Sequence, residues 1–257
     1  MKLQKGDLVT RNSYNNDTVF KILNIKDDIC YLKGVDVRLY ADSETIDLVK
    51  YEVSKEDDFE ENIEDSLLLD RNEYFYIPGK ILHFDGDGDY LQRCLGYYKK
   101  LKVRAVGKVI KEDILPAKIF KYLHDYTPDI VIITGHDAYY KKKGPPDDIN
   151  NYKNSKYFCE AIRIARKYEK SHEKLVIVAG ACQSDYEELI KSGANYASSP
   201  RRVNIHALDP AIIAITVALT EKNTPIDLID TLAKTKYGAD GMGGIKGTGL
   251  MYVGYPR

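Results

Sequence analysis

Two apolar segments that each end in a reactive side chain constrain the fold of this chain more than any other feature. The first is Asp129-Ile-Val-Ile-Ile-Thr-Gly-His136, and the second is Leu175-Val-Ile-Val-Ala-Gly-Ala-Cys182. Continuous apolar runs of this length predict strands that are buried on both faces of a parallel sheet. Because the carboxyl ends of neighbouring parallel strands line one crevice, we expect an imidazole and a thiol at the same edge. That pair is the minimum equipment for catalysis by a cysteine nucleophile.

His136 and Cys182 are 46 positions apart (182 minus 136), a separation that fits one strand–helix–strand crossover. A thiol attacks as a thiolate, and a nearby imidazole or a helix N-terminus favours that form. Cys182 has a candidate for each, since a helix is predicted to begin at Asp185. Backbone N–H groups at the strand ends can polarise a substrate carbonyl. The candidates for this oxyanion role are Gly135, Gly180 and Ala181.

The composition argues against several classes of protein. The chain has 257 residues, of which 44% are apolar and 30% charged, and its formal net charge is -1. This balance gives no general reason to expect nucleic acid or an anionic membrane surface as a partner. No stretch of the sequence approaches the roughly 20 apolar residues of a membrane span, and the N-terminus lacks the apolar core of a secretion signal. We therefore expect a protein that is made and kept inside a cell.

The four cysteines show no metal-binding pattern. None of them stands in a C-x-x-C pair, so the spacing of a zinc site is absent. Cys30, Cys94 and Cys159 lie in apolar or helical stretches, where a buried inert thiol is expected. Only Cys182 follows a strand at a glycine-rich turn. The sequence predicts neither a metal nor a cofactor.

The residue pattern divides the chain into three parts. Residues 1–51 alternate short strands with polar turns and predict a small five-stranded barrel of the SH3 or KOW type, with a hairpin formed by 29–33 and 36–40. Residues 52–78 are acidic and predict a solvated linker or an exposed helix. Residues 79–257 predict an α/β domain with a mostly parallel sheet flanked by helices. Strands are expected at 80–84 and 103–110, ending at 136 and 182, and at 196–199 and 249–254; helices are expected at 90–100, 114–124, 155–169, 185–191, 210–220 and 226–234.

The order of the two strand-end motifs resembles that of the caspase-like cysteine peptidases. In those enzymes a strand that ends in a histidine and a glycine precedes a strand that ends in Ala-Cys. Here the pairs are Gly135-His136 and Ala181-Cys182. The glycine stands before the histidine, and Gly180 replaces the caspase Gln, so caspase substrate preferences are not carried over.

Nearly the entire chain resembles the YabG family of sporulation-specific cysteine proteases. The resemblance runs from Gly6-Asp-Leu-Val-Thr-Arg11 and Asp36-Val-Arg-Leu-Tyr-Ala-Asp42 to the long terminal motif Lys236-Tyr-Gly-Ala-Asp-Gly-Met-Gly-Gly-Ile-Lys-Gly-Thr-Gly-Leu-Met-Tyr-Val-Gly-Tyr-Pro-Arg257. It implies an endopeptidase with a caspase-like fold that processes spore coat and cortex proteins late in sporulation, with His136 and Cys182 as its catalytic pair. It also implies a protein of the mother-cell cytoplasm that later associates with the spore coat.

The resemblance further implies cleavage after a basic residue, Arg in particular. An arginine pocket needs a buried carboxylate for bidentate pairing. The loop after the first strand of the α/β domain, Asp85-Gly-Asp-Gly-Asp89, supplies Asp85 and Asp87 as hypothetical selectors. The loop does not fit an EF-hand, because Tyr90 and Gly96 stand where Gly and Glu are needed. A solvated turn is the competing interpretation. Further candidate acids are Asp137, Asp209 and Asp240.

Two other functions stay open. In a class I amidotransferase-like hydrolase the histidine follows the cysteine, and His206 lies 24 positions after Cys182 (206 minus 182). In those enzymes the cysteine stands on a sharp strand-to-helix turn with a glycine after it. That glycine is missing here, which weighs against this alternative. The other alternative is a non-catalytic coat scaffold that binds through the small barrel. The glycine-rich segment 238–247 matches no P-loop and predicts a mobile loop for substrate binding or autoprocessing. The sequence defines no oligomeric state.

Overall fold

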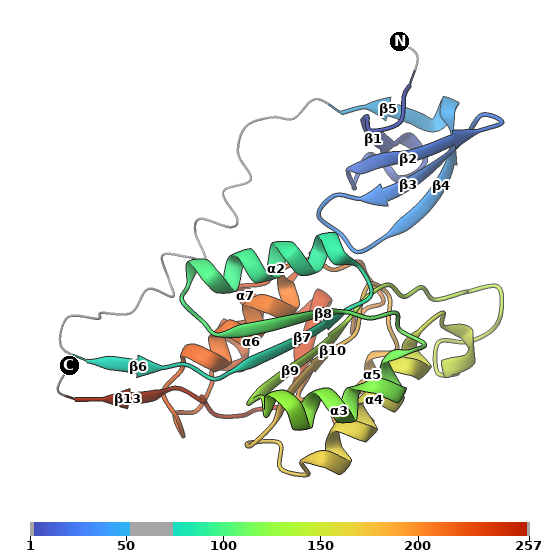
Figure 1. The fold of residues 1–257 in the computed structure, drawn as a ribbon. Coiled ribbons are helices and arrows are strands. Elements are labelled where there is room, and N and C mark those ends of the chain that lie inside the picture. Colours follow the sequence, from blue (N-terminus) through green and yellow to red (C-terminus); the bar gives the residue numbers. More distant parts are fainter. Residues whose placement is uncertain (1–2, 52–73, 256–257) are drawn as a thin grey trace. The chain divides into compact units, whose positions relative to one another are not determined.

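Two units, Met1–Asp58 and Phe59–Arg257, make up the chain in a computed structural model that describes residues 3–51 and 74–255 (Figure 1). Most of the predicted acidic linker, residues 52–73, lies outside the described residues. Within the ranges that are described, no helix is both long and apolar enough to cross a membrane.

The first unit contains an antiparallel sheet of five short strands in the order β4-β3-β2-β1-β5. Alternate residues of its strands point inward, as expected for a sheet with one buried face. The prediction of five short strands is confirmed. The elements are β1 (Leu8–Arg11), η1 (Asn12–Tyr14), β2 (Phe20–Lys26), β3 (Ile29–Gly34), β4 (Tyr40–Glu44), η2 (Thr45–Asp47) and β5 (Leu48–Lys50). The buried core consists of Val9, Phe20, Ile22, Cys30, Leu32 and Leu48.

The turns of this sheet explain where its strands begin. Asp27 and Asp28 have positive φ angles of 49° and 63°, the conformation of a two-residue hairpin turn whose twist matches the flanking strands. The predicted strand at 36–40 is wrong, because β4 begins only at Tyr40. The Gly34 N–H donates to the Leu39 carbonyl, and the Leu39 N–H donates to the Val37 carbonyl. These bonds close a loop over residues that have a strand-like pattern.

The second unit is built around a six-stranded sheet in the order β12-β11-β10-β9-β7-β8. Its strands are parallel to their neighbours except for β12, which pairs with β11 in the antiparallel direction. The strands are β7 (Ile81–Asp85), β8 (Ala105–Val109), β9 (Ile130–Thr134), β10 (Val176–Ala179), β11 (Tyr196–Ser198) and β12 (Met242–Gly244).

Helices cover both faces of this sheet (Figure 1). One face carries α2 (Gly88–Lys100), α6 (Asp209–Leu219) and α7 (Leu228–Ala233), and the other carries α3 (Leu115–Tyr126), α4 (Ser155–Tyr168) and α5 (Tyr186–Lys191). The described residues of this unit also form two short helices, η3 (Ile149–Asn151) and α8 (Gly238–Gly241). The predicted α/β fold, with a mostly parallel sheet flanked by helices, is confirmed.

The interior of this unit follows the apolar patterns of the sequence. All residues of β9 are buried, as a continuous apolar run predicts. The predicted stripe of α4, Phe158, Ala161, Ile162 and Ala165, is also buried, which fits a helix with one apolar face. Helix α6 is buried along its whole length and therefore lies in the interior of the unit.

The glycine-rich segment near the C-terminus forms regular secondary structure, whereas the sequence predicts a loop there. It forms α8 and then β12, which closes one edge of the sheet against β11. A side chain at Gly243 would meet the Tyr186 ring, and one at Gly244 would meet the Tyr196 ring. Glycine therefore lets the strand approach the sheet more closely than any other residue would.

A separate two-stranded sheet joins distant parts of the second unit. β6 (Phe75–Ile77) pairs with β13 (Tyr252–Gly254) in the antiparallel direction. β6 lies at the end of the segment that the sequence predicts to be a linker. The Phe75 ring occupies the space that a side chain at Gly254 would need, so this cross-strand pair requires glycine.

Candidate functional site

The order in which successive strands are added to the sheet reverses between β7 and β9, and we call this place the reversal point. Numbered in chain order, the strands from β7 to β11 lie in the order 2-1-3-4-5, which is a doubly wound arrangement. In such sheets ligands bind outside the carboxyl ends of the strands, at the point of reversal. The segments there are 85–87 at the end of β7 and 135–137 after β9. Both contain residues that the sequence predicts to be functional.

His136 and Cys182 leave neighbouring strands at the same level of the sheet. Ile133 of β9 is the parallel partner of Ala179 of β10. His136 and Cys182 each stand three positions beyond one member of this pair. The register therefore brings both residues to one edge, as expected from the two apolar runs.

The His136 imidazole is held by a carboxylate. Its Nε2 lies 3.2 Å from Oδ2 of Asp87, and the two side chains are only 13% and 8% exposed. The ring also lies against Tyr90, with 5.8 Å between the ring centroids. Asp87 is the N-cap of α2, where its Oδ1 accepts from the Asp89 N–H at 2.9 Å. The start of the helix thus fixes the carboxylate that orients the imidazole.

The backbone of His136 is held on two further sides. Its N–H donates to Oε1 of Glu112 at 2.7 Å, and its carbonyl accepts from Nδ2 of Asn154 at 2.7 Å. Glu112 comes from the segment between β8 and α3. A side chain at Gly86 or at Gly135 would collide with its carboxylate. Glycine at both positions therefore makes room for the group that holds the His136 backbone.

Cys182 is buried, and its sulfur contacts the backbone of Ile205. The Ile205 N–H donates to Sγ at 3.3 Å, and Sγ lies 3.7 Å from the Ile205 carbonyl oxygen. An N–H group directed at sulfur stabilises negative charge on it. Cys159 and Cys30 are buried to the same extent as Cys182, and burial raises the pKa of Cys159 to about 11 and also raises that of Cys30. Both of those thiols stay protonated at neutral pH.

The backbone around Cys182 has unusual conformations. Gly180 has a φ of 104°, and Gln183, which is not glycine, has a φ of 57°. Positive φ values at residues other than glycine cost of order 1 kcal/mol and gather at functional sites. Tertiary contacts hold this turn in place, among them the Ser198 hydroxyl, which donates to the Ala181 carbonyl at 2.7 Å.

Asp137 joins three segments at this edge. Its carboxylate accepts from the Asn154 N–H at 2.7 Å and from the hydroxyls of Ser155 at 2.5 Å and Ser184 at 2.9 Å. Ser155 begins α4, and Ser184 lies in the turn that contains Cys182. Burial raises the pKa of Asp137 to about 6, and these hydrogen bonds oppose the shift.

Comparisons with known proteins identify the family of the chain. A family model described as YabG peptidase U57 matches residues 4–256. The sporulation-specific protease YabG of Bacillus subtilis (strain 168) is 41% identical over 286 residues, which cover 100% of this chain and 99% of that protein. The chain belongs to the YabG peptidase family. It is therefore a sporulation protease. The resemblance to the YabG family that the sequence motifs indicate is confirmed.

In this YabG-family chain, two of the predicted selector acids lie at the reversal point of the sheet. Asp85 is fully buried and accepts from the Asp87 N–H and from Oγ1 of Thr134, each at 2.9 Å. Its Oδ2 also lies 3.7 Å from Nε2 of His83. Asp87 contacts His136 as described above. The loop after β7 is thus tied to the neighbouring strand β9 rather than being a freely solvated turn.

The third predicted acid and the alternative base lie together at the start of α6. Asp209 is buried and accepts from the His206 N–H at 2.9 Å. The His206 ring is buried as well: its Nδ1 accepts from the Leu208 N–H at 3.2 Å, and its Nε2 lies 3.5 Å from Nη2 of Arg93. His206 directly follows Ile205, whose backbone contacts the Cys182 sulfur.

The predicted oxyanion donors differ in their surroundings. The Gly180 N–H donates to the Ile133 carbonyl at 3.0 Å, and the Ala181 N–H donates to Oγ of Ser184 at 2.9 Å. Gly135 lies against the carboxylate of Glu112. The oxyanion role of all three stays a prediction, and Gly180 and Ala181 would have to exchange these acceptors to take it up.

Sequence reasoning does not find the polar side chains that support this edge from other segments. These are Glu112, Asn154, Ser155 and Ser184. Asn154 and Ser184 stand just before predicted helices, where such residues are typical caps, so a local signal exists but points to a capping role. Glu112 has no local signal, because its partner His136 lies on another strand end.

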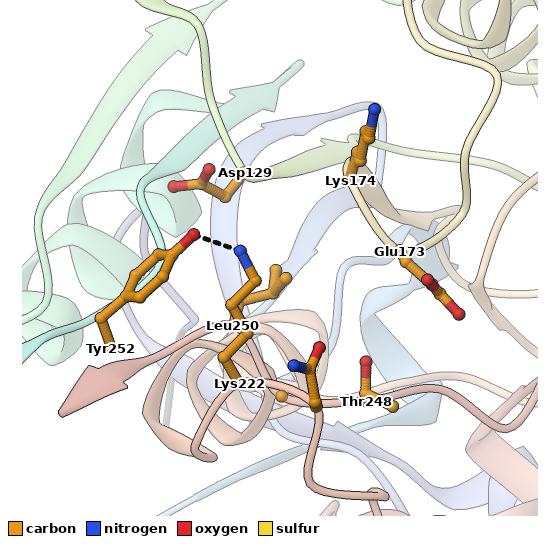
Figure 2. Close-up of a pocket in the computed structure, with 9 residues that line it drawn as sticks. Asp129, Glu173, Lys174, Lys222, Thr248, Leu250 and Tyr252 are labelled. Atoms are coloured by element: carbon orange, nitrogen blue, oxygen red, sulfur yellow. Dashed lines mark hydrogen bonds between the residues drawn. The ribbon is translucent and has the colours of Figure 1, made fainter.

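A cavity of about 350 Å³ lies at the opposite edge of the sheet (Figure 2). Asp129 precedes β9, and Lys174 precedes β10, so the cavity lies at the amino ends of these strands. Figure 2 shows the hydrogen bond between Lys222 Nζ and the Tyr252 hydroxyl beside it. Its lining contains none of the residues that the sequence predicts to be functional.

Replacing Gly180 by alanine is expected to lower the free energy of unfolding and the peptidase activity. The added Cβ would collide with Oγ of Ser198, and a φ of 104° strains any L-residue, at a cost of roughly 1–3 kcal/mol. Urea unfolding measures the first effect and substrate cleavage the second. The control is Gly96→Ala in α2, where nothing lies within 4 Å and stability should rise slightly. A Gly180→Ala protein with wild-type stability would contradict the strain.

Asp137 is expected to weaken the folded state as the pH rises from about 4 to about 6. Its pKa is raised from 3.8 to about 6, so the folded state holds this proton more tightly than the unfolded state does. The contribution of the group to stability is therefore greatest below pH 4 and is lost as the pH rises through 6. Asp137→Asn removes the titration. Urea unfolding at pH 4, 5, 6 and 7 should show the wild type losing stability relative to the variant across this window, and a constant difference would disprove the shift.

Proposed function

We propose that the protein is a cysteine endopeptidase of sporulation in which Cys182 is the nucleophile and His136 is the base. The observation that carries the proposal is the register of β9 and β10, which brings both residues to one edge of the sheet beside its reversal point. The Asp87 carboxylate, 3.2 Å from Nε2, would hold the imidazole in a fixed orientation. Asp87 thereby extends the predicted pair of residues to three.

The chemistry follows from the roles of these groups. His136 takes the proton of the Cys182 thiol, and Sγ attacks the carbonyl carbon of the scissile peptide bond. Backbone N–H groups at the ends of β9 and β10, with Gly135 among them, stabilise the oxyanion that forms. His136 then gives its proton to the leaving amine, and the peptide C–N bond breaks. A water molecule hydrolyses the remaining thioester and restores the thiol.

The chain order and the two sheets support the finer parts of the assignment. A histidine at one strand end, followed by a cysteine at the end of the neighbouring strand, is the arrangement that a caspase-like peptidase needs. Five short antiparallel strands in the first unit support an SH3-like module, for which we propose docking of coat proteins. The corresponding location is the mother-cell cytoplasm and later the spore coat.

The proposed substrates are spore coat and cortex-associated proteins, cut after arginine. A guanidinium needs a carboxylate that is shielded from water. Asp85 at the reversal point of the sheet is shielded in this way, and to pair with a guanidinium it would have to exchange the donors Asp87 N–H and Thr134 Oγ1 that its two oxygens now accept from. Asp87 lies beside it but also contacts His136, so its loss would affect every substrate. Asp209 remains the third candidate.

One observation favours the amidotransferase-like alternative. The Cys182 sulfur contacts the backbone of Ile205, the residue before His206. In that function His206 would be the base, and His136 would be dispensable. A non-catalytic scaffold would need neither histidine and would have no reason to keep one thiol more reactive than the others.

Cys182→Ala and His136→Ala are each expected to reduce cleavage of an arginine-containing coat protein by roughly 10³-fold or more, because each removes a group that acts in the chemical step. His206→Gln should stay within about tenfold of the wild type. Single-turnover cleavage followed by mass spectrometry measures the rates, and circular dichroism checks that each variant is folded.

Two results would reject this assignment. Equal cleavage by wild type and Cys182→Ala would end the cysteine mechanism. Loss of activity in His206→Gln with full activity in His136→Ala would favour the amidotransferase-like arrangement. Iodoacetamide labelling of the native protein provides an independent check: Cys30, Cys159 and Cys182 are all buried, so faster labelling of Cys182 would have to come from its activation by His136.

Asp85→Asn is expected to lower kcat/KM for a peptide cut after Arg by about 10–100-fold and to leave cleavage of the matching citrulline peptide almost unchanged, because only the charged guanidinium needs the carboxylate. Asp87→Asn should reduce both rates, since Asp87 also contacts His136. Asp89→Asn, an exposed position in the same loop, is the control for net charge. Unchanged Arg preference in Asp85→Asn and Asp87→Asn would move the pocket elsewhere, with Asp209 as the next candidate.

A further inference from the structure

The turn that carries Cys182 is tied to the His136 loop through one buried acid. The Ala181 N–H donates to Oγ of Ser184 at 2.9 Å, and the Ser184 hydroxyl donates in turn to Oδ2 of Asp137 at 2.9 Å. Asp137 is the residue after His136 and is 4% exposed. A continuous chain of hydrogen bonds therefore runs from the residue before Cys182 to the residue after His136.

The same carboxylate also holds the start of α4. Oδ2 accepts from the Ser155 hydroxyl at 2.5 Å, and Ser155 Oγ accepts from the Asp185 N–H at 2.8 Å. Oδ1 accepts from the Asn154 N–H at 2.7 Å, and Nδ2 of Asn154 donates to the His136 carbonyl at 2.7 Å. Asp137 thus reaches the Cys182 turn along two routes and returns to His136 along a third.

The turn needs support of this kind. Gly180 and Gln183, on either side of Cys182, have positive φ values of 104° and 57°. A backbone with such values persists only where the surrounding structure over-determines it. The bond from the Ala181 N–H to Ser184 Oγ spans Cys182 and Gln183, and Asp137 is the acceptor that sets the direction of the Ser184 hydroxyl.

We propose that Asp137 is a positioning residue that keeps the Cys182 turn and the His136 loop in the relative placement that proton transfer requires. This inference rests on the proposed roles of Cys182 and His136. A carboxylate suits the position because it accepts from all of its donors at once, including both serine hydroxyls. An asparagine would present an NH₂ group to two of them, so at least one hydroxyl would have to turn away.

The test uses the full chain and compares Asp137→Asn, Ser184→Ala and the double variant on a peptide cut after Arg. Proton transfer and attack depend on placement within fractions of an ångström, so kcat should fall about 10–100-fold in Asp137→Asn and about 5–20-fold in Ser184→Ala, while KM stays within about threefold. Since both act along one route, the double variant should be no more than about twofold worse than Asp137→Asn. Iodoacetamide labelling of Cys182 should slow in the same order.

Asp129→Asn is the matched control. Its carboxylate also accepts a backbone hydrogen bond, from the Lys80 N–H at 2.8 Å, but it lies at the amino end of β9, and the kcat of this variant should equal that of the wild type.

Wild-type kcat in Ser184→Ala, a rise in KM without a fall in kcat, or fully additive losses in the double variant would each overturn the proposal. If Asp137→Asn does not fold, Ser184→Ala and Ser155→Ala decide by the same kcat and KM criteria. Activity in Cys182→Ala would instead overturn the proposed function, whereas an inactive Cys182→Ala with normal serine variants would overturn only this inference.

Discussion

The parallel pairing of β9 with β10 holds the two strand ends of the candidate site at one level. Two continuous apolar runs form these strands, and both are buried on each face of the sheet. Because Ile133 pairs with Ala179, the chain leaves the two strands at one level, where His136 and Cys182 follow. A slip of one residue in this register would move one of them about 3.3 Å along the sheet relative to the other. The hydrophobic effect thereby sets the geometry of a polar site.

The polar groups at this edge are costly to bury, and they are satisfied mainly by one another. Asp85 accepts from Thr134, and Oγ1 of Thr134 also lies 2.9 Å from Nε2 of the buried His83. Asp137 collects donors from three segments, and Glu112 holds the His136 N–H. Each loop at the carboxyl edge is therefore fixed by side chains that belong to other loops. A site of this construction gains precision, and it transmits a change at one residue to its neighbours.

The sequence predicts the elements of the second unit well, because local periodicity specifies each of them. The predictions fail in two places. In the first unit, residues 36–40 have a strand-like pattern, but the Gly34 N–H donates to the Leu39 carbonyl and closes a loop there. In the second unit, the sequence predicts a loop at Gly243 and Gly244. These residues form a strand, because their lack of a side chain leaves room for the rings of Tyr186 and Tyr196. For the site, the two strand-end residues could be predicted, whereas the roles of Glu112 and Ser184 could not. Nothing local marks Glu112, whose partner follows another strand, and the local signal at Ser184 is that of a helix cap.

Apolar runs and the long terminal motif are local features of the chain, and they suffice to predict the family, the α/β class of the second unit and an imidazole and a thiol at two strand ends. The surroundings of these two groups depend on tertiary contacts. Folding gives His136 the Asp87 carboxylate, places the Cys182 sulfur against Ile205 and joins the two loops through Asp137. The physical reason is that a buried polar group takes whichever partners the packed strands and helices bring within hydrogen-bond distance, and those partners are far apart along the chain.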